Sequence, residues 1–103
     1  MTHLPIACSL DSRALAVRHS DLRASVLAEA TATERLPDGY RWRFATGENL
    51  VARIGAVVDA ERLCCRFLRF QVQTEPDGAA VTLDVNGPEG TAEFLESWLG
   101  SSR

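Results

Sequence analysis

The chain has 103 residues, a formal net charge of -3, 46% hydrophobic residues and 24% charged residues. This length supports one domain with one hydrophobic core, and the composition is that of an ordinary globular protein. We therefore expect a single domain over residues 1–103. A mildly acidic chain lacks the basic surface of a nucleic-acid-binding protein, and no apolar run approaches the ~20 residues of a membrane helix. These features predict a cytoplasmic protein that binds neither nucleic acid nor membrane.

The first third of the chain predicts a helix and a hairpin. Asp11-Ser12 contains helix-capping residue types, and apolar residues follow at near-helical spacing to about residue 28. Residues 31–36 form a weak strand pattern, and Pro37-Asp38-Gly39 predicts a turn because proline fixes φ and glycine permits a positive φ. In residues 40–44 aromatic side chains alternate with arginine, which predicts a half-buried strand.

The middle of the chain predicts a second helix and a second hairpin. Residues 46–49 open the helix, and an apolar stripe at helical spacing runs from Leu50 to Leu68, about 20 residues. Residues 70–75 predict a strand. Pro76-Asp77-Gly78 repeats the three residues of the first turn, and residues 81–85 alternate in the manner of a further strand.

The end of the chain predicts a third helix. Asn86 with Glu89 three residues later has the spacing of a capping box. Gly100 would end the helix. The expected buried face is formed by Phe94, Leu95, Trp98 and Leu99.

Two segments share one plan of strand, Pro-Asp-Gly turn, strand and helix, with an offset of 76 − 37 = 39 residues between the turns. This pseudo-repeat predicts an α+β fold in which an N-terminal helix precedes two β-hairpin–helix units, in the order α-ββ-α-ββ-α. Hairpins must bury their apolar side, so we expect antiparallel pairing with the helices on one face. The pattern leaves open whether the hairpins form one sheet or two.

The chain contains three cysteines, Cys8, Cys64 and Cys65. An odd number with two adjacent residues does not fit the disulfide framework of a small secreted protein. The default expectation in a reducing cytoplasm is therefore free thiols.

The cysteines and Glu61 form the candidate site. On a helix, Glu61 lies one turn before Cys64 and Cys65, and the apolar stripe places this carboxylate on the inner face, where burial without a partner is costly. Two thiols beside it are soft donors suited to Hg, As(III), Cu(I), Cd or Zn. Cys8 precedes the first helix and is a candidate third thiolate. The pattern thus predicts a metal site of Cys64, Cys65, Glu61 and Cys8 for one thiophilic ion of unknown identity, with sequestration or delivery as its use.

Two other interpretations stay open. Free cysteine often fills core space, and adjacent helical residues point about 100° apart. The cysteines could thus be inert in an interaction module, for example a homodimer formed through a sheet edge or the first helix. A thiol-dependent enzyme, such as one that cleaves organomercurials or reduces an oxyanion, would need a low-pKa cysteine and Glu61 as proton donor.

The run Glu61-Arg62-x-Cys64-Cys65-x-Phe67-Leu68-x-Phe70, together with Cys8-Ser9-Leu10 and Gly87-Pro88-Glu89-Gly90, resembles a family of small, largely uncharacterised bacterial proteins. The resemblance extends over most of the chain and implies an association with heavy-metal resistance genes, without a defined activity. It implies roles for Cys8, Glu61, Cys64 and Cys65. Family members often carry proline at the position of Arg66, which would end the helix just after the thiols.

Overall fold

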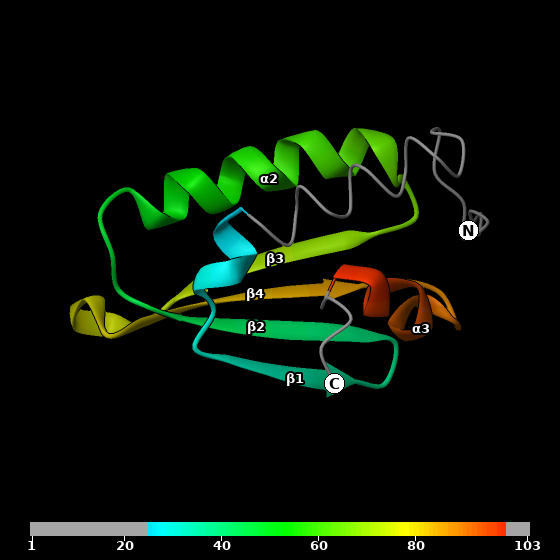
Figure 1. Ribbon diagram of the computed structural model, residues 1–103, viewed down its shortest axis with the longest axis horizontal. Helices are drawn as coiled ribbons and strands as arrows, with labels where there is room; N and C mark the ends of the chain where they lie inside the picture. Colours follow the sequence, from blue (N-terminus) through cyan, green and yellow to red (C-terminus); the bar gives the residue numbers. More distant parts are fainter. Residues whose placement is uncertain (1–24, 99–103) are drawn as a thin grey trace.

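The computed structural model describes residues 25–98 of the chain (Figure 1). Short 3-10 turns (η) accompany two α-helices and four strands. In chain order the elements are η1 (Val26–Glu29), β1 (Ala32–Leu36), β2 (Gly39–Ala45), α2 (Leu50–Cys64), β3 (Arg69–Thr74), η2 (Pro76–Gly78), β4 (Ala80–Asn86), α3 (Thr91–Leu95) and η3 (Glu96–Trp98).

The two hairpins join into one antiparallel sheet with the strand order β1-β2-β4-β3. The second strand of each hairpin lies at the centre, and these two strands pair with each other. Trp42 lies opposite Leu83, and Phe44 lies opposite Val81. The sequence repeat left open whether the hairpins form one sheet or two. The structure has one four-stranded sheet, because β2 of the first hairpin pairs with β4 of the second.

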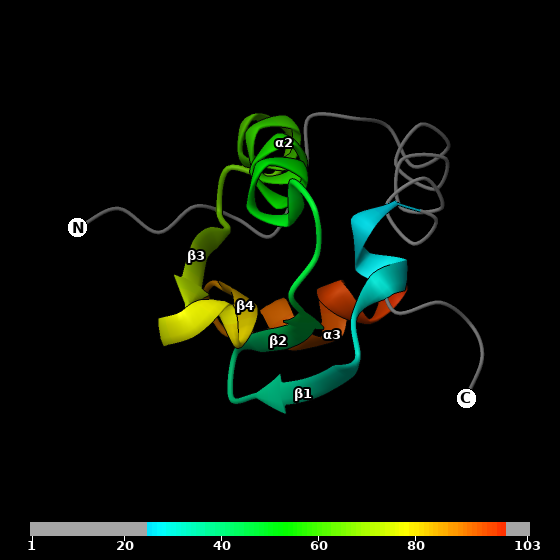
Figure 2. The same cartoon turned by 90° about the vertical axis from the view of Figure 1, so that its left-hand side faces the viewer.

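One face of this sheet holds the core. Trp42 and Leu83 are 2% and 0% exposed, and they share a hydrophobic cluster with Ile54 of α2. The ring centroids of Trp42 and Trp98 are 6.1 Å apart, which places η3 on the same face. Figure 2 shows α2 lying over the sheet on this side. The prediction of an α+β fold with an antiparallel sheet is confirmed.

The opposite face of the sheet is polar. Arg41 and Asp84 are directly opposite each other on the central strands, and the guanidinium donates from Nε and Nη2 to the two carboxylate oxygens, each at 2.8 Å. Such a two-pronged pair fixes the register as well as contributing attraction. The Asp84 side chain raises the pKa of Arg41 by this hydrogen bonding and by its charge.

The two Pro-Asp-Gly segments adopt different conformations although their sequences are identical. Pro37 and Asp38 form a two-residue loop, because Leu36 pairs directly with Gly39. The second segment lies in a longer loop in which the Glu75 N–H donates to Ala80 O at 2.9 Å. There Asp77 and Gly78 both adopt positive φ, at 62° and 65°.

Three expectations about helices change. The second helix ends at Cys64 rather than near Leu68, and the third begins at Thr91, with Gly90 in the N-cap position. The capping box expected at Asn86 is wrong, because Asn86 is the last residue of β4. The sequence predicts an N-terminal helix from about residue 11 to about residue 28, and the part of it up to residue 24 lies outside the described residues. The remaining part is not an α-helix but the 3-10 turn η1. The expectation that the third helix continues to Gly100 is wrong, because α3 ends at Leu95 and the 3-10 turn η3 follows it.

Among residues 25–98, none of the helices has the length and apolar character needed to cross a lipid bilayer.

Candidate metal centre

Helix α2 carries the candidate site on its inner face. Its buried residues are Leu50, Ile54, Glu61 and Cys64, which recur at helical spacing and turn one stripe toward the sheet. Glu61 is 1% exposed, so the prediction that this carboxylate lies on the inner face is confirmed. Val57 and Val58 pack against the core as partly buried neighbours.

The helix ends between the two cysteines. Cys65 has φ −114° and ψ 80°, outside the helical region, while its N–H still donates to Glu61 O at 2.7 Å. Leu68 N–H then donates to Cys65 O at 3.1 Å and closes a turn. Because Cys65 leaves the helical conformation, its side chain is not held about 100° away from that of Cys64. The two sulfurs lie 3.8 Å apart.

Glu61, Cys64 and Cys65 form one buried cluster. A carboxylate oxygen of Glu61 and the two sulfurs all lie within 4.8 Å of one another. The three residues are 1%, 7% and 0% exposed. A buried group of one oxygen and two sulfur ligands at this spacing could hold a metal ion. Three of the four predicted ligands thus lie together, and the fourth, Cys8, lies outside the described residues.

The two cysteines differ in redox state. Cys64 is a free thiol, whereas Cys65 is disulfide-bonded. Cys64 is not the partner of Cys65, since their sulfurs are 3.8 Å apart and a disulfide requires about 2.05 Å. The expectation of free thiols therefore holds for Cys64 and is wrong for Cys65 in this structure. In its disulfide form, Cys65 cannot act as a thiolate ligand.

The segment after the cysteines is held against the end of the sheet. The rings of Phe67 and Phe94 meet edge to face with centroids 5.1 Å apart. Gly87 lies so close to this segment that a Cβ would be 3.1 Å from Phe67 O and 2.5 Å from Thr91 Oγ1. The turn that follows Cys65 therefore packs against α3, through Phe94, and against the β4–α3 connection, through Gly87.

Arginine side chains near the site are exposed, namely Arg62, Arg66 and Arg69. Arg62 lies in the last turn of α2, where a positive charge interacts favourably with the helix dipole.

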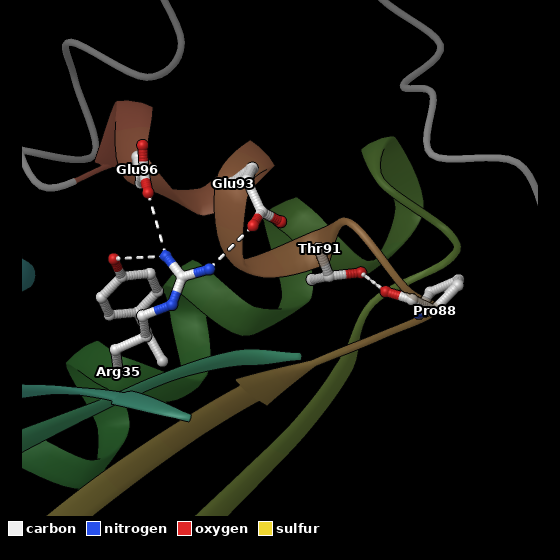
Figure 3. A network of polar contacts seen from close by, with 6 residues as sticks. Arg35, Pro88, Thr91, Glu93 and Glu96 are labelled. Carbon is white, nitrogen blue, oxygen red and sulfur yellow. Dashed lines mark hydrogen bonds and ion pairs between the residues drawn. The ribbon is translucent and has the colours of Figure 1, made fainter. Parts of the chain in front are cut away.

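A second network, which the sequence did not reveal, fixes α3 to the sheet (Figure 3). Arg35 of β1 donates to Glu93 at 2.8 Å and to Glu96 at 3.0 Å. A hydrogen bond from its own main chain and then the bond from Arg35 lower the pKa of Glu93. Thr91 Oγ1 donates to Pro88 O at 2.6 Å and stabilises the turn that precedes α3. No local sequence signal connects these residues, because Arg35 and Glu93 are 58 positions apart.

A cleft of about 430 Å³ lies at the other end of α2. Its walls come from the start of the helix, including Leu50, and from the β3–β4 connection, including Glu75 and Gly78. Leu50 and Cys64 are fourteen residues apart on one helix, which corresponds to about 21 Å at 1.5 Å per residue. The cleft is therefore separate from the cysteine cluster.

The chain matches no family model, no curated protein and no solved structure in the three comparisons. The resemblance to the bacterial family therefore stays a prediction.

Proposed function

We propose that the chain, with the Cys65 disulfide reduced, binds one thiophilic metal or metalloid ion through Cys64, Cys65 and Glu61. The observation that supports this function is the convergence of three buried ligand atoms within 4.8 Å. Thiolates prefer soft ions, and the carboxylate supplies an additional donor. Cys8 remains the predicted further thiolate ligand.

The separation of the two sulfurs bears on how they would bind one ion after reduction of Cys65. Two sulfurs that bind one ion at about 2.3 Å in tetrahedral geometry are about 3.8 Å apart, whereas a linear arrangement separates them by about 4.6 Å. The distance between the sulfurs of Cys64 and Cys65 is 3.8 Å. If the Cys65 sulfur keeps this position once its disulfide is reduced, the separation would fit Zn(II), Cd(II) or As(III), which bind thiolates at bent angles, better than ions held linearly between two thiolates.

The burial of the cluster favours binding over catalysis. Glu61 and Cys65 are 1% and 0% exposed, so a bare ion fits the site better than an organic substrate, which would need room beside the sulfurs. We therefore propose sequestration or delivery of the ion as the role of the chain.

The test is a titration of the full chain, reduced with a phosphine, with Cd(II) and with As(III). Binding is followed by calorimetry, by the sulfur-to-metal absorption band and by a count of thiols that still react. We expect one ion per chain and protection of Cys64 and Cys65. Cys64→Ser and Cys65→Ser should each weaken binding by more than about a hundredfold, since changes in the second shell alone cost about 10–100-fold.

Glu61→Gln tests the carboxylate, and Asp59→Asn is its matched control. Asp59 is exposed on the same helix, so the same chemical change is made away from the cluster. We expect Glu61→Gln to weaken binding and Asp59→Asn to leave it unchanged. Failure of the reduced chain to bind any of these ions, with both thiols unreactive in the folded state, would instead identify the cysteines as inert core residues.

A further inference from the structure

Strand β3 presents a free edge over the part of the chain that the structure describes. β3 pairs with β4 on one side and with no strand among residues 25–98 on the other. A free edge carries main-chain N–H and C=O groups that can pair with another chain. Val72 at the centre of β3 is 42% exposed, and it is one of the large hydrophobic residues on the surface.

The hydrogen bond at the end of β3 shows which residues direct their main chain outward. Glu75 N–H donates to Ala80 O, so Glu75 is bonded toward β4. In an antiparallel pair the main-chain groups alternate between the two sides. Gln71 and Gln73 therefore point their main-chain groups toward β4 as well, whereas Phe70, Val72 and Thr74 point theirs toward the free edge.

We propose that two copies of the chain dimerise by antiparallel pairing of their β3 strands, with Val72 opposite Val72 of the second copy. This register pairs Phe70 with Thr74 of the second copy, so that every outward-facing residue of β3 meets another. Three hydrogen-bonded residue pairs then form about six main-chain hydrogen bonds. A shift by two residues in either direction leaves one outward residue in each copy without an opposite partner.

The side chains of β3 are self-complementary in the same register. Arg69 at the start of the strand meets Glu75 of the second copy just beyond its end, and Gln71 meets Gln73. Arg69, Gln71 and Gln73 are exposed and Glu75 is half-buried. Opposite charges and amide pairs across antiparallel strands are stabilising, and the two-fold symmetry makes each such contact twice.

The dimer would have one continuous eight-stranded sheet. The two-fold axis is perpendicular to the sheet, so both copies of α2 lie on the same side and the two polar faces form one surface. The two Val72 side chains come into contact on the helix-covered side, where each copy has Leu83 as the opposite residue in β4. This contact removes apolar surface from water.

The test is sedimentation of the full chain over a range of concentrations, with a phosphine present to exclude disulfide-linked dimers. We expect a species of twice the 11.3 kDa chain mass. Arg69→Glu and Glu75→Arg should each raise the dissociation constant by about tenfold or more, and the double exchange Arg69→Glu/Glu75→Arg should restore dimerisation. Arg43→Glu is the matched control, because it makes the same change of charge at an exposed residue of β2, which β4 separates from the β3 edge.

A second variant tests the main-chain pairing. Val72→Pro removes an outward N–H that the β3–β4 pairing does not use, a position where edge strands tolerate proline. Circular dichroism and thermal unfolding check that the variant folds, and the expected result is loss of the dimer. A wild-type chain that stays monomeric, or a dimer that Val72→Pro and both charge reversals leave unchanged, would overturn the proposal.

Discussion

Cys64 and Cys65 are consecutive in the chain, yet their sulfurs lie 3.8 Å apart inside the core. Helix α2 ends between them, and Cys65 adopts φ −114° and ψ 80°. A continuous helix would direct adjacent side chains about 100° apart. The end of the helix therefore makes the pair a candidate for binding one ion together with Glu61.

The redox state of Cys65 should control metal uptake. Cys65 is disulfide-bonded and Cys64 is a free thiol, and a disulfide sulfur is not a thiolate donor. We expect the chain purified without reductant to bind Cd(II) at least about tenfold more weakly than the phosphine-reduced chain. Calorimetry on both preparations measures the difference. Equal affinities would show that Cys65 is not a ligand.

Arg66 should accept proline. Cys65, Arg66, Phe67 and Leu68 form a turn closed by the bond from Leu68 N–H to Cys65 O, and Arg66 occupies the second position, which favours proline. We expect Arg66→Pro to stabilise the fold by about 0.4–1 kcal/mol, because proline restricts the unfolded chain. Urea unfolding measures the change.

A control for this variant is Phe67→Pro, which places proline at the third position of the turn, where it is disfavoured. It should destabilise the fold. If both variants unfolded the chain equally, the turn assigned to these residues would be incorrect.

Replacement of glycine by alanine should change the free energy of unfolding in opposite directions at Gly39 and Gly55. A Cβ on Gly39 would lie 2.0 Å from Val85 O and 2.5 Å from Asn86 Oδ1. The adjacent strand cannot move away without breaking its pairing, so Gly39→Ala should cost about 3 kcal/mol or more. Gly55 lies inside α2 with nothing within 4 Å of such a Cβ. Gly55→Ala should therefore raise the free energy of unfolding by about 0.5–1 kcal/mol, since alanine is the better helix former.

Urea denaturation of both glycine variants tests this pair. A destabilised Gly55→Ala variant would mean that the space beside α2 is filled in solution, and a neutral Gly39→Ala variant would contradict the close approach of β2 and β4.

Two ion pairs should make stability depend on acidic pH. Hydrogen bonding to Arg53 lowers the pKa of Glu29, and its own main chain and then Arg35 lower the pKa of Glu93. A carboxyl whose pKa is lowered by folding contributes stability above its ordinary value of 4.5, and that contribution is lost as the pH falls through the lowered value. We expect the urea concentration at the midpoint of unfolding to decrease as the pH is lowered below about 5.

Glu93→Gln should reduce the fall of the unfolding midpoint at acidic pH, because the variant has no carboxylate at this position that protonation could neutralise. Glu89→Gln is the control, since Glu89 is exposed in the connection before α3. Urea midpoints measured over the acidic range for both variants test the assignment. An identical pH dependence in wild type and Glu93→Gln would show that the contact with Arg35 does not contribute in solution.

Local patterns were sufficient to predict the four strands, the existence of α2 and the inner position of Glu61. Period-two alternation around Trp42 and helical spacing from Leu50 depend on side chains a few residues apart, so one sequence contains the required information. The same reasoning misplaced helix ends, because the conformation of Cys65 and of Gly90 depends on packing by distant segments. The contact of Phe67 with Phe94 is one example.

The sequence by itself determined the α+β class, the two hairpins and the residue types of the candidate site. Only the tertiary structure decided that the hairpins share one sheet through β2 and β4, that Arg35 reaches Glu93, and that Glu61, Cys64 and Cys65 converge within 4.8 Å. The physical reason is how far apart in the chain the interacting residues are. Periodicity reports which side of an element is apolar, whereas strand order, helix termination and ligand convergence depend on contacts between residues far apart in the chain.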